Sequence, residues 1–112
     1  MTRDSLQDLM SRLRRDYLGE VPARIQDLRR TTEEWLAGGE PEPPLQVLFH
    51  RLAGSAGAYG YTEVSLICRT AERFVNAKPG RNAETAAKLE AAIGAVEQTF
   101  TRGPTGPDIT AD

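Results

Sequence analysis

Apolar residues recur at three- and four-residue intervals along most of this chain, and that spacing constrains its fold more than any other feature. The interval places apolar side chains on one face of a helix. No segment alternates apolar and polar residues between turn signals as a β-strand does, and β-branched and aromatic residues are sparse. The sequence therefore predicts an all-α protein.

The pattern predicts five helical segments. Gly19 is expected to end a first short helix, whose apolar positions are Leu6, Leu9, Leu13 and Tyr17. Pro22 suits the first turn of a second helix. The glycine- and proline-rich segment 38–44 forms a loop before the third helix, which ends at Gly60. Thr62 is expected to cap the fourth helix, and Asn82 the fifth.

Short connections favour antiparallel neighbours, so we expect an antiparallel up-and-down four-helix bundle with an extra short N-terminal helix. Residues 1–102 are expected to form this single domain. Residues 103–112 show no periodic spacing of apolar residues and contain few of them. They are expected to form a disordered C-terminal tail.

The only histidine, His50, lies opposite the apolar stripe of the third predicted helix. That stripe consists of Leu45, Leu48, Leu52, Ser55 or Ala56, and Tyr59. A helix rotates about 100° per residue, so His50 lies roughly 160–200° from Leu48 and Leu52. Phe49 falls between the two faces and is expected at the edge of the buried stripe.

The residues that share the face of His50 have almost no side chain. They are Ala53, Gly54 and Gly57, three, four and seven positions further on. Each glycine inside a helix costs roughly 0.8–1.0 kcal/mol relative to alanine. Close approach of a partner at Gly54 explains this cost, and tight packing of a neighbouring helix explains it equally well. A third interpretation is that His50 is a surface residue without a function.

The run His50–Ala56, followed by Tyr59 and Gly60, resembles the signature of histidine-containing phosphotransfer (HPt) domains. Members carry a histidine, an apolar residue two positions on, a glycine four positions on and a second glycine ten positions on. Leu52, Gly54 and Gly60 match this spacing. The similarity extends weakly over residues 5–101. One departure is Ala53, where many members have a lysine.

The resemblance implies a phosphorelay intermediate, in which His50 accepts a phosphoryl group from a receiver-domain aspartate and passes it to another receiver. The implied docking face is Arg51, Ala53, Gly54 and Gly57. The implied partners are response-regulator receiver domains and a hybrid sensor histidine kinase, and the receiver would supply the aspartate, a lysine and Mg²⁺. No cofactor is expected in this chain, which is expected to be a monomer.

Ala53 leaves open which cation assists the phosphoryl group. Arg51 is nearest in sequence, but it lies about 100° round the helix and reads equally well as a solvated surface charge. The departure motivates an alternative function, a non-transferring helical adaptor that binds a receiver or a sensor kinase. A bundle whose histidine face is covered by a second copy is a further alternative.

Composition excludes several other classes. The net charge is −2, and acidic and basic residues are interspersed, so the sequence does not predict the basic surface that nucleic-acid binding requires. No stretch has the apolar length of a membrane span, and the N terminus lacks the apolar core of a signal peptide. The single cysteine, Cys68, lies in a predicted buried stripe and fits a cytoplasmic protein. One histidine and one cysteine are too few for a zinc site, and no phosphate-binding loop for ATP is present.

Overall fold

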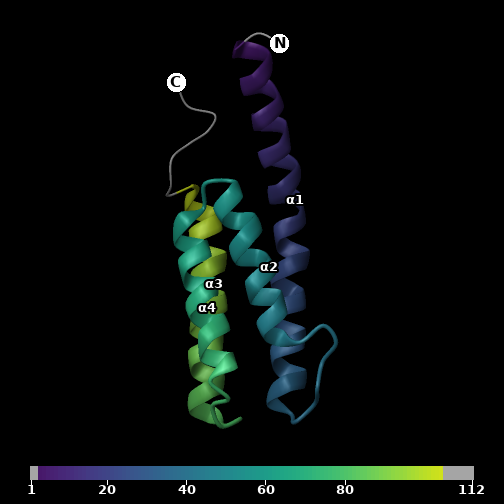
Figure 1. Cartoon of the computed structure of the whole chain (residues 1–112), viewed down its shortest axis with the longest axis vertical. Coiled ribbons are helices and arrows are strands. Elements are labelled where there is room, and N and C mark those ends of the chain that lie inside the picture. The colour runs from purple at the N-terminus through teal and green to yellow at the C-terminus, as the bar shows by residue number, and fades with distance from the viewer. Residues whose placement is uncertain (1–2, 105–112) are drawn as a thin grey trace.

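The computed structural model describes residues 3–104, which form four helices and no strand. They are α1 (Arg3–Leu36), α2 (Leu45–Ala58), α3 (Thr62–Asn76) and α4 (Ala83–Arg102). Helices α1 and α3 each pack against both α2 and α4, and the chain reverses direction at each connection (Figure 1). The prediction of an all-α helical bundle is confirmed. From residue 105 onwards, the predicted tail 103–112 lies outside the residues that the structure describes.

The first helix corrects the sequence-based boundaries. The prediction of a separate short N-terminal helix is wrong, because α1 continues through Gly19 and Pro22 to Leu36. Proline lacks a backbone N–H and usually interrupts a helix. Here Pro22 is exposed, while its neighbours Val21 and Ile25 are buried in the core, so packing keeps the helix continuous.

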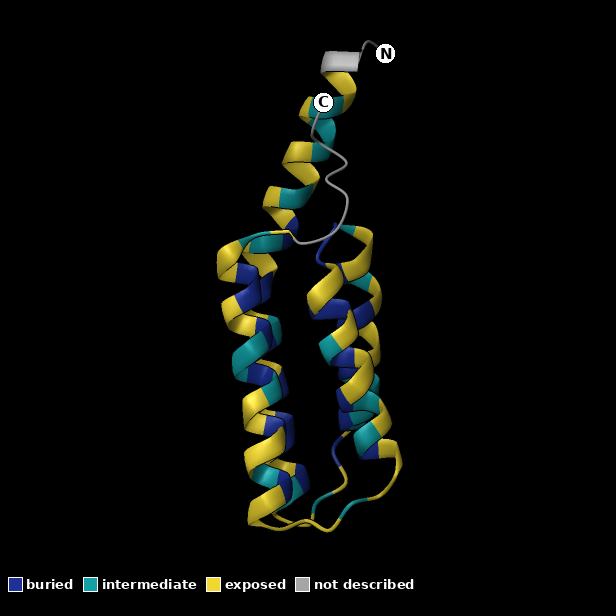
Figure 2. Cartoon of the chain, turned by 90° about the vertical axis from the view of Figure 1, so that its left-hand side faces the viewer, coloured by how far each residue is buried: buried dark blue, intermediate teal, exposed yellow. Residues whose placement is uncertain are grey.

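The N-terminal part of α1 projects beyond the ends of the other helices (Figures 1 and 2). Of the apolar residues expected on its inner face, Tyr17 is buried, whereas Leu6 and Leu13 remain 49% and 39% exposed. The helical periodicity of this segment is therefore real, but the other three helices end before they can cover it.

Buried residues line the inward faces of all four helices (Figure 2). On α2 they are Leu45, Phe49, Leu52, Ala53 and Ala56. Phe49 is fully buried, so its predicted place at the edge of the stripe is wrong. The buried arc is rotated towards Phe49 and Ala53, because α3 packs closely against that side of α2.

Tyr17 joins α1 to the second half of α2. Its hydroxyl lies 2.9 Å from the Ser55 hydroxyl, and its ring stacks on Tyr59 with centroids 4.5 Å apart. Burial raises the pKa of Tyr17 above its usual range, and the Ser55 hydrogen bond opposes that shift. These contacts hold α2 at a fixed rotation about its own axis.

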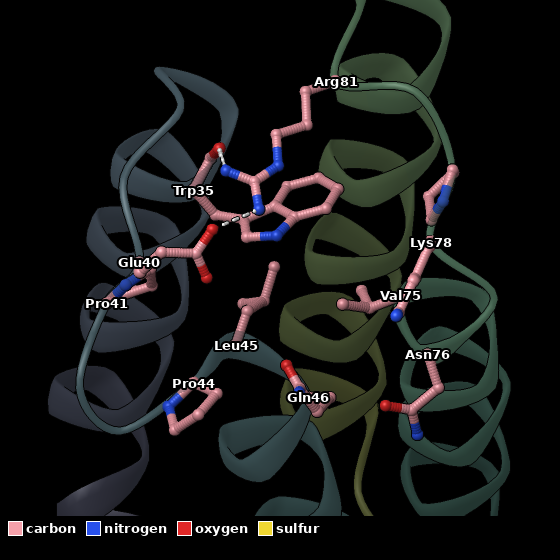
Figure 3. Close-up of a pocket in the computed structure, with 11 residues that line it drawn as sticks. Trp35, Glu40, Pro41, Pro44, Leu45, Gln46, Val75, Asn76, Lys78 and Arg81 are labelled. Carbon is pink, nitrogen blue, oxygen red and sulfur yellow. Dashed lines mark hydrogen bonds and ion pairs between the residues drawn. The ribbon is translucent and has the colours of Figure 1, made fainter.

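Arg81 joins the loop that follows α1 to the turn between α3 and α4. Its guanidinium donates to the carbonyl oxygens of Trp35 at 3.1 Å and Gly39 at 3.0 Å, and pairs with Glu40 at 2.9 Å. It also lies 4.6 Å from the centroid of the Trp35 ring. Figure 3 shows these side chains around a pocket that is also lined by Leu45, the first residue of α2.

The prediction that Thr62 caps a helix is wrong, because Thr62 is the first residue of α3 and Tyr61 stands at the cap position without a side-chain hydrogen bond. Local signals predicted the boundaries at Gly60 and Asn82 better. Gly60 lies in the connection between α2 and α3 with φ at +87°, in the left-handed region that favours glycine. The Asn82 side chain accepts a hydrogen bond from the backbone N–H of Thr85 and so caps α4. No helix within residues 3–104 combines the length and apolar character needed to span a membrane.

Candidate functional site

His50 stands on the outer side of α2, and 74% of its side chain is exposed to solvent. Its position follows from the burial of Phe49 and Leu52, which hold the opposite side of the helix in the core. The imidazole is carried by a packed helix rather than by a loop, so its position is well defined.

Glu72 on α3 binds the inner nitrogen of this imidazole. Nδ1 of His50 lies 3.1 Å from Oε1 and 3.0 Å from Oε2 of Glu72. A carboxylate only accepts hydrogen bonds, so Nδ1 must carry the proton and donate it. In a neutral ring the free electron pair is then on Nε2, the nitrogen that faces away from Glu72.

A hollow of about 450 Å³ lies beside His50 between α2 and α3. It is lined by His50, Ala53, Gly54, Arg69, Glu72 and Arg73. The guanidinium groups of Arg69 and Arg73 have no hydrogen bond or ion pair with any residue that the structure describes. The site thus combines a nucleophilic nitrogen, a carboxylate that orients it and two unpaired cations.

Comparison with protein families matches residues 12–100 to the Hpt domain. The chain belongs to the Hpt domain family. Hpt domains carry out histidine phosphotransfer in two-component systems, where they interact with receiver domains and kinases. Searches against curated proteins and against solved structures found no match.

The predicted docking face of this Hpt domain divides into residues with different environments. Gly54 is exposed, and a Cβ atom added there would meet no atom within 4 Å. Gly57 is also exposed, but an added Cβ would lie 3.3 Å from Oγ of Ser65 on α3. Close packing of α3 therefore explains Gly57, whereas open space at Gly54 leaves room for a partner.

The two other predicted docking residues, Ala53 and Arg51, have surroundings unlike those of Gly54. Ala53 is only 3% exposed, so it forms the floor of the hollow rather than an open surface. Arg51 lines a separate hollow with Arg24 and Asp27 of α1. Its place on the other side of α2 follows from the rotation of about 100° per residue.

Sequence reasoning missed the three α3 residues at the site. Glu72 lies seven positions after the buried Ser65, along the edge of the buried stripe of α3. That spacing marks a polar residue at a helix–helix boundary, and is the signal that could have singled out Glu72. Nothing in the sequence pairs Arg69 or Arg73 with His50, because their proximity depends on how α2 and α3 pack.

Cys68 takes no part in this site. It is fully buried, and desolvation raises the pKa of its thiol to about 12. A thiol that holds its proton so tightly is a poor nucleophile. Within the described residues, no group of three or more His, Cys, Asp or Glu side chains is arranged to hold a metal ion.

Proposed function

We propose that His50 is the phosphoryl acceptor of this Hpt domain, and that it receives the group at Nε2 from an aspartyl phosphate of a receiver domain. The observation that carries this proposal is the contact of Nδ1 with Glu72, which directs the free electron pair of the ring towards solvent. A second receiver then takes the group from Nε2 through its own aspartate.

In the forward step, the Nε2 electron pair of His50 forms a bond to phosphorus. The bond between phosphorus and the donor aspartate oxygen breaks, and its electron pair leaves with the carboxylate. The ring proton stays on Nδ1, where the Glu72 carboxylate faces the positive charge that the ring acquires. The return step reverses these events on the second aspartate.

The proposal assigns the metal ion to the partner. Phosphoryl transfer depends mainly on positioning and on neutralising the charge of the phosphoryl oxygens. A receiver with an aspartate, a lysine and Mg²⁺ brings most of that machinery, and the open helix surface at Gly54 leaves room for it to approach. A hybrid sensor kinase is the proposed origin of the phosphoryl group.

We extend the proposal to a monomer that works in the cytoplasm. The exposed His50 and Gly54 must stay uncovered for a receiver to reach them, which favours a single copy. The free thiol of Cys68 is of the kind that a reducing compartment maintains. Sizing in solution and cell fractionation test these two points.

Radiolabel transfer tests the function. The protein is mixed with a receiver that carries ³²P on its aspartate, and label on this chain is followed with time. The wild type should become labelled, and the label should be stable in alkali and released in acid. His50→Gln should take up no label while its helical circular dichroism stays unchanged. Binding of the phosphorylated receiver without label on the wild type would overturn the proposal and favour an adaptor.

A further inference from the structure

The surface around His50 carries an excess of positive charge. Helix α2 contains no acidic residue, and α3 contains only Glu63 and Glu72. Glu63 lies 3.8 Å from Arg102 of α4, and Glu72 binds His50. No carboxylate of α2 or α3 therefore neutralises the two arginines in the hollow.

These arginines share one side of α3. Arg69 and Arg73 are four positions apart, which places them one helical turn from each other and on the same face. Glu72 is the acidic residue nearest to both in sequence, yet its carboxylate points to Nδ1 of His50. Both guanidinium groups thus border the hollow without an ion pair to any of the described residues.

We propose that Arg69 and Arg73 form an anion site for the phosphoryl group on Nε2 of His50. The site rests on the proposed function of His50, and supplies from α3 the cations that many family members supply from α2. A guanidinium presents a planar pair of N–H donors that matches two phosphate oxygens. Ala53 forms the floor of the hollow, so no side chain from α2 fills the space between the imidazole and the arginines.

The two arginines also explain why a helix without a lysine at position 53 can retain transfer. Neutralising the phosphoryl oxygens lowers the barrier in both directions. Each exposed charge contact is expected to change the rate by about three- to fivefold, and the pair by about tenfold. Glu72 does not cancel this effect, because it brings one negative charge to a hollow lined by two guanidinium groups.

A titration with inorganic phosphate tests the site without any phosphoryl transfer. The backbone amide signals of Gly54 and Arg73 are followed by NMR as phosphate is added to the unmodified protein. We expect saturable shifts in the wild type and at least fivefold weaker binding in Arg69→Ala/Arg73→Ala. Arg15→Ala, which removes one charge from an exposed position of α1, should bind as the wild type does. Equal binding by the double variant would overturn the proposal.

The labelling rate then connects the site to transfer. Phosphoramidate donates a phosphoryl group to imidazole with loss of ammonia, and needs no protein partner. The double alanine variant should be labelled about tenfold more slowly than the wild type, Arg69→Lys/Arg73→Lys should recover part of the rate, and Arg15→Ala should match the wild type. Labelling of the double alanine variant at the wild-type rate would contradict the role in transfer.

The two experiments separate the two proposals. A wild type that takes up no label from phosphoramidate or from a phosphorylated receiver contradicts the function of His50, whatever the arginines do. The phosphate titration still decides in that case whether Arg69 and Arg73 bind an anion. Normal labelling with unchanged phosphate binding in the double alanine variant removes the anion site and leaves the function intact.

Discussion

Glu72 on α3 holds Nδ1 of His50 on α2 with both of its carboxylate oxygens, at 3.1 and 3.0 Å. The two residues are 22 positions apart, and only the packing of α2 on α3 brings them together. His50 is 74% exposed, whereas Glu72 is only 22% exposed. The carboxylate is thus partly protected, while most of the imidazole remains open to solvent.

Replacing Glu72 should slow phosphoryl uptake by releasing the imidazole. In Glu72→Ala the proton is free to occupy either nitrogen, so we expect the rate from a phosphorylated receiver to fall about three- to tenfold. Glu72→Gln keeps an oxygen that accepts a hydrogen bond from Nδ1. Its rate should therefore lie between those of the wild type and Glu72→Ala. Long-range ¹H–¹⁵N NMR of the ring should show the Nε2–H tautomer appearing in Glu72→Ala.

Glu33→Ala provides the matched control, because Glu33 is an exposed glutamate of α1 outside the hollow. It should change neither the labelling rate nor the tautomer. If Glu72→Ala keeps both the rate and the ring spectrum of the wild type, the proposed role of Glu72 is wrong.

A large side chain at Gly54 should block the protein partner but spare the chemistry. Gly54→Leu adds its side chain into open space, and leucine favours a helix over glycine by up to about 1 kcal/mol. We expect stability to be kept or raised and transfer from a receiver to fall at least tenfold. Labelling by phosphoramidate should continue, since that small donor needs little room.

Gly19→Leu is the control for this experiment, because an added side chain at Gly19 in α1 also meets open space. It should gain similar stability and transfer at the wild-type rate. Equal receiver rates for Gly54→Leu and the wild type would mean that a receiver does not approach over Gly54.

Alkaline pH should destabilise the fold through Cys68. Burial raises the pKa of this thiol from 9.0 to about 12, so the folded state holds the proton more tightly than the unfolded state. The resulting stability is fully present below pH 9 and is lost as pH rises towards 12. Between pH 7 and pH 10 the free energy of unfolding should fall by about 1 kcal/mol because of this residue.

Urea unfolding of the wild type and of Cys68→Ala measures this loss. The variant cannot ionise at this position, so its stability should decline less between pH 7 and pH 10. Parallel pH profiles for the two proteins would show that the thiol does not contribute.

Arg81 should matter for stability and not for transfer. Its contacts with the Trp35 and Gly39 carbonyl oxygens and with Glu40 lie at the loop end of the bundle, away from the hollow beside His50. Arg81→Ala should lower the free energy of unfolding by about 2 kcal/mol. Arg81→Lys should recover only part of it, because lysine lacks the planar fork of donors.

Denaturant unfolding and radiolabel uptake at a temperature where both variants are folded check this separation. A variant that loses transfer while its stability is unchanged would link the loop end to the reaction, which contradicts the account.

Local signals in the sequence were enough to predict the helical class, the exposed His50 and the cap at Asn82. Each depends on residues within about one or two turns of the helix. They failed at Gly19 and Pro22, where the expected break does not occur. The burial of Val21 and Ile25 keeps α1 continuous there, and that burial depends on the whole bundle.

The site itself was only half predictable. The position of His50 follows from periodicity within α2, but the residues that give it chemistry come from α3. Glu72 binds the imidazole, and Arg69 and Arg73 border the same hollow, only because α3 packs beside Gly57 and Ala53. Helix rotation within a bundle is set by the volumes of all the core side chains, and one stripe alone does not determine it.

Identifying the phosphorylated nitrogen tests the central claim most directly. The wild-type protein is phosphorylated by a receiver and studied by ³¹P and ¹H–¹⁵N NMR, with ¹⁵N in the single imidazole ring. We predict one phosphoryl group on Nε2 of His50, with the Nδ1 proton retained against Glu72. Phosphorylation at Nδ1, on another residue or not at all would contradict the account.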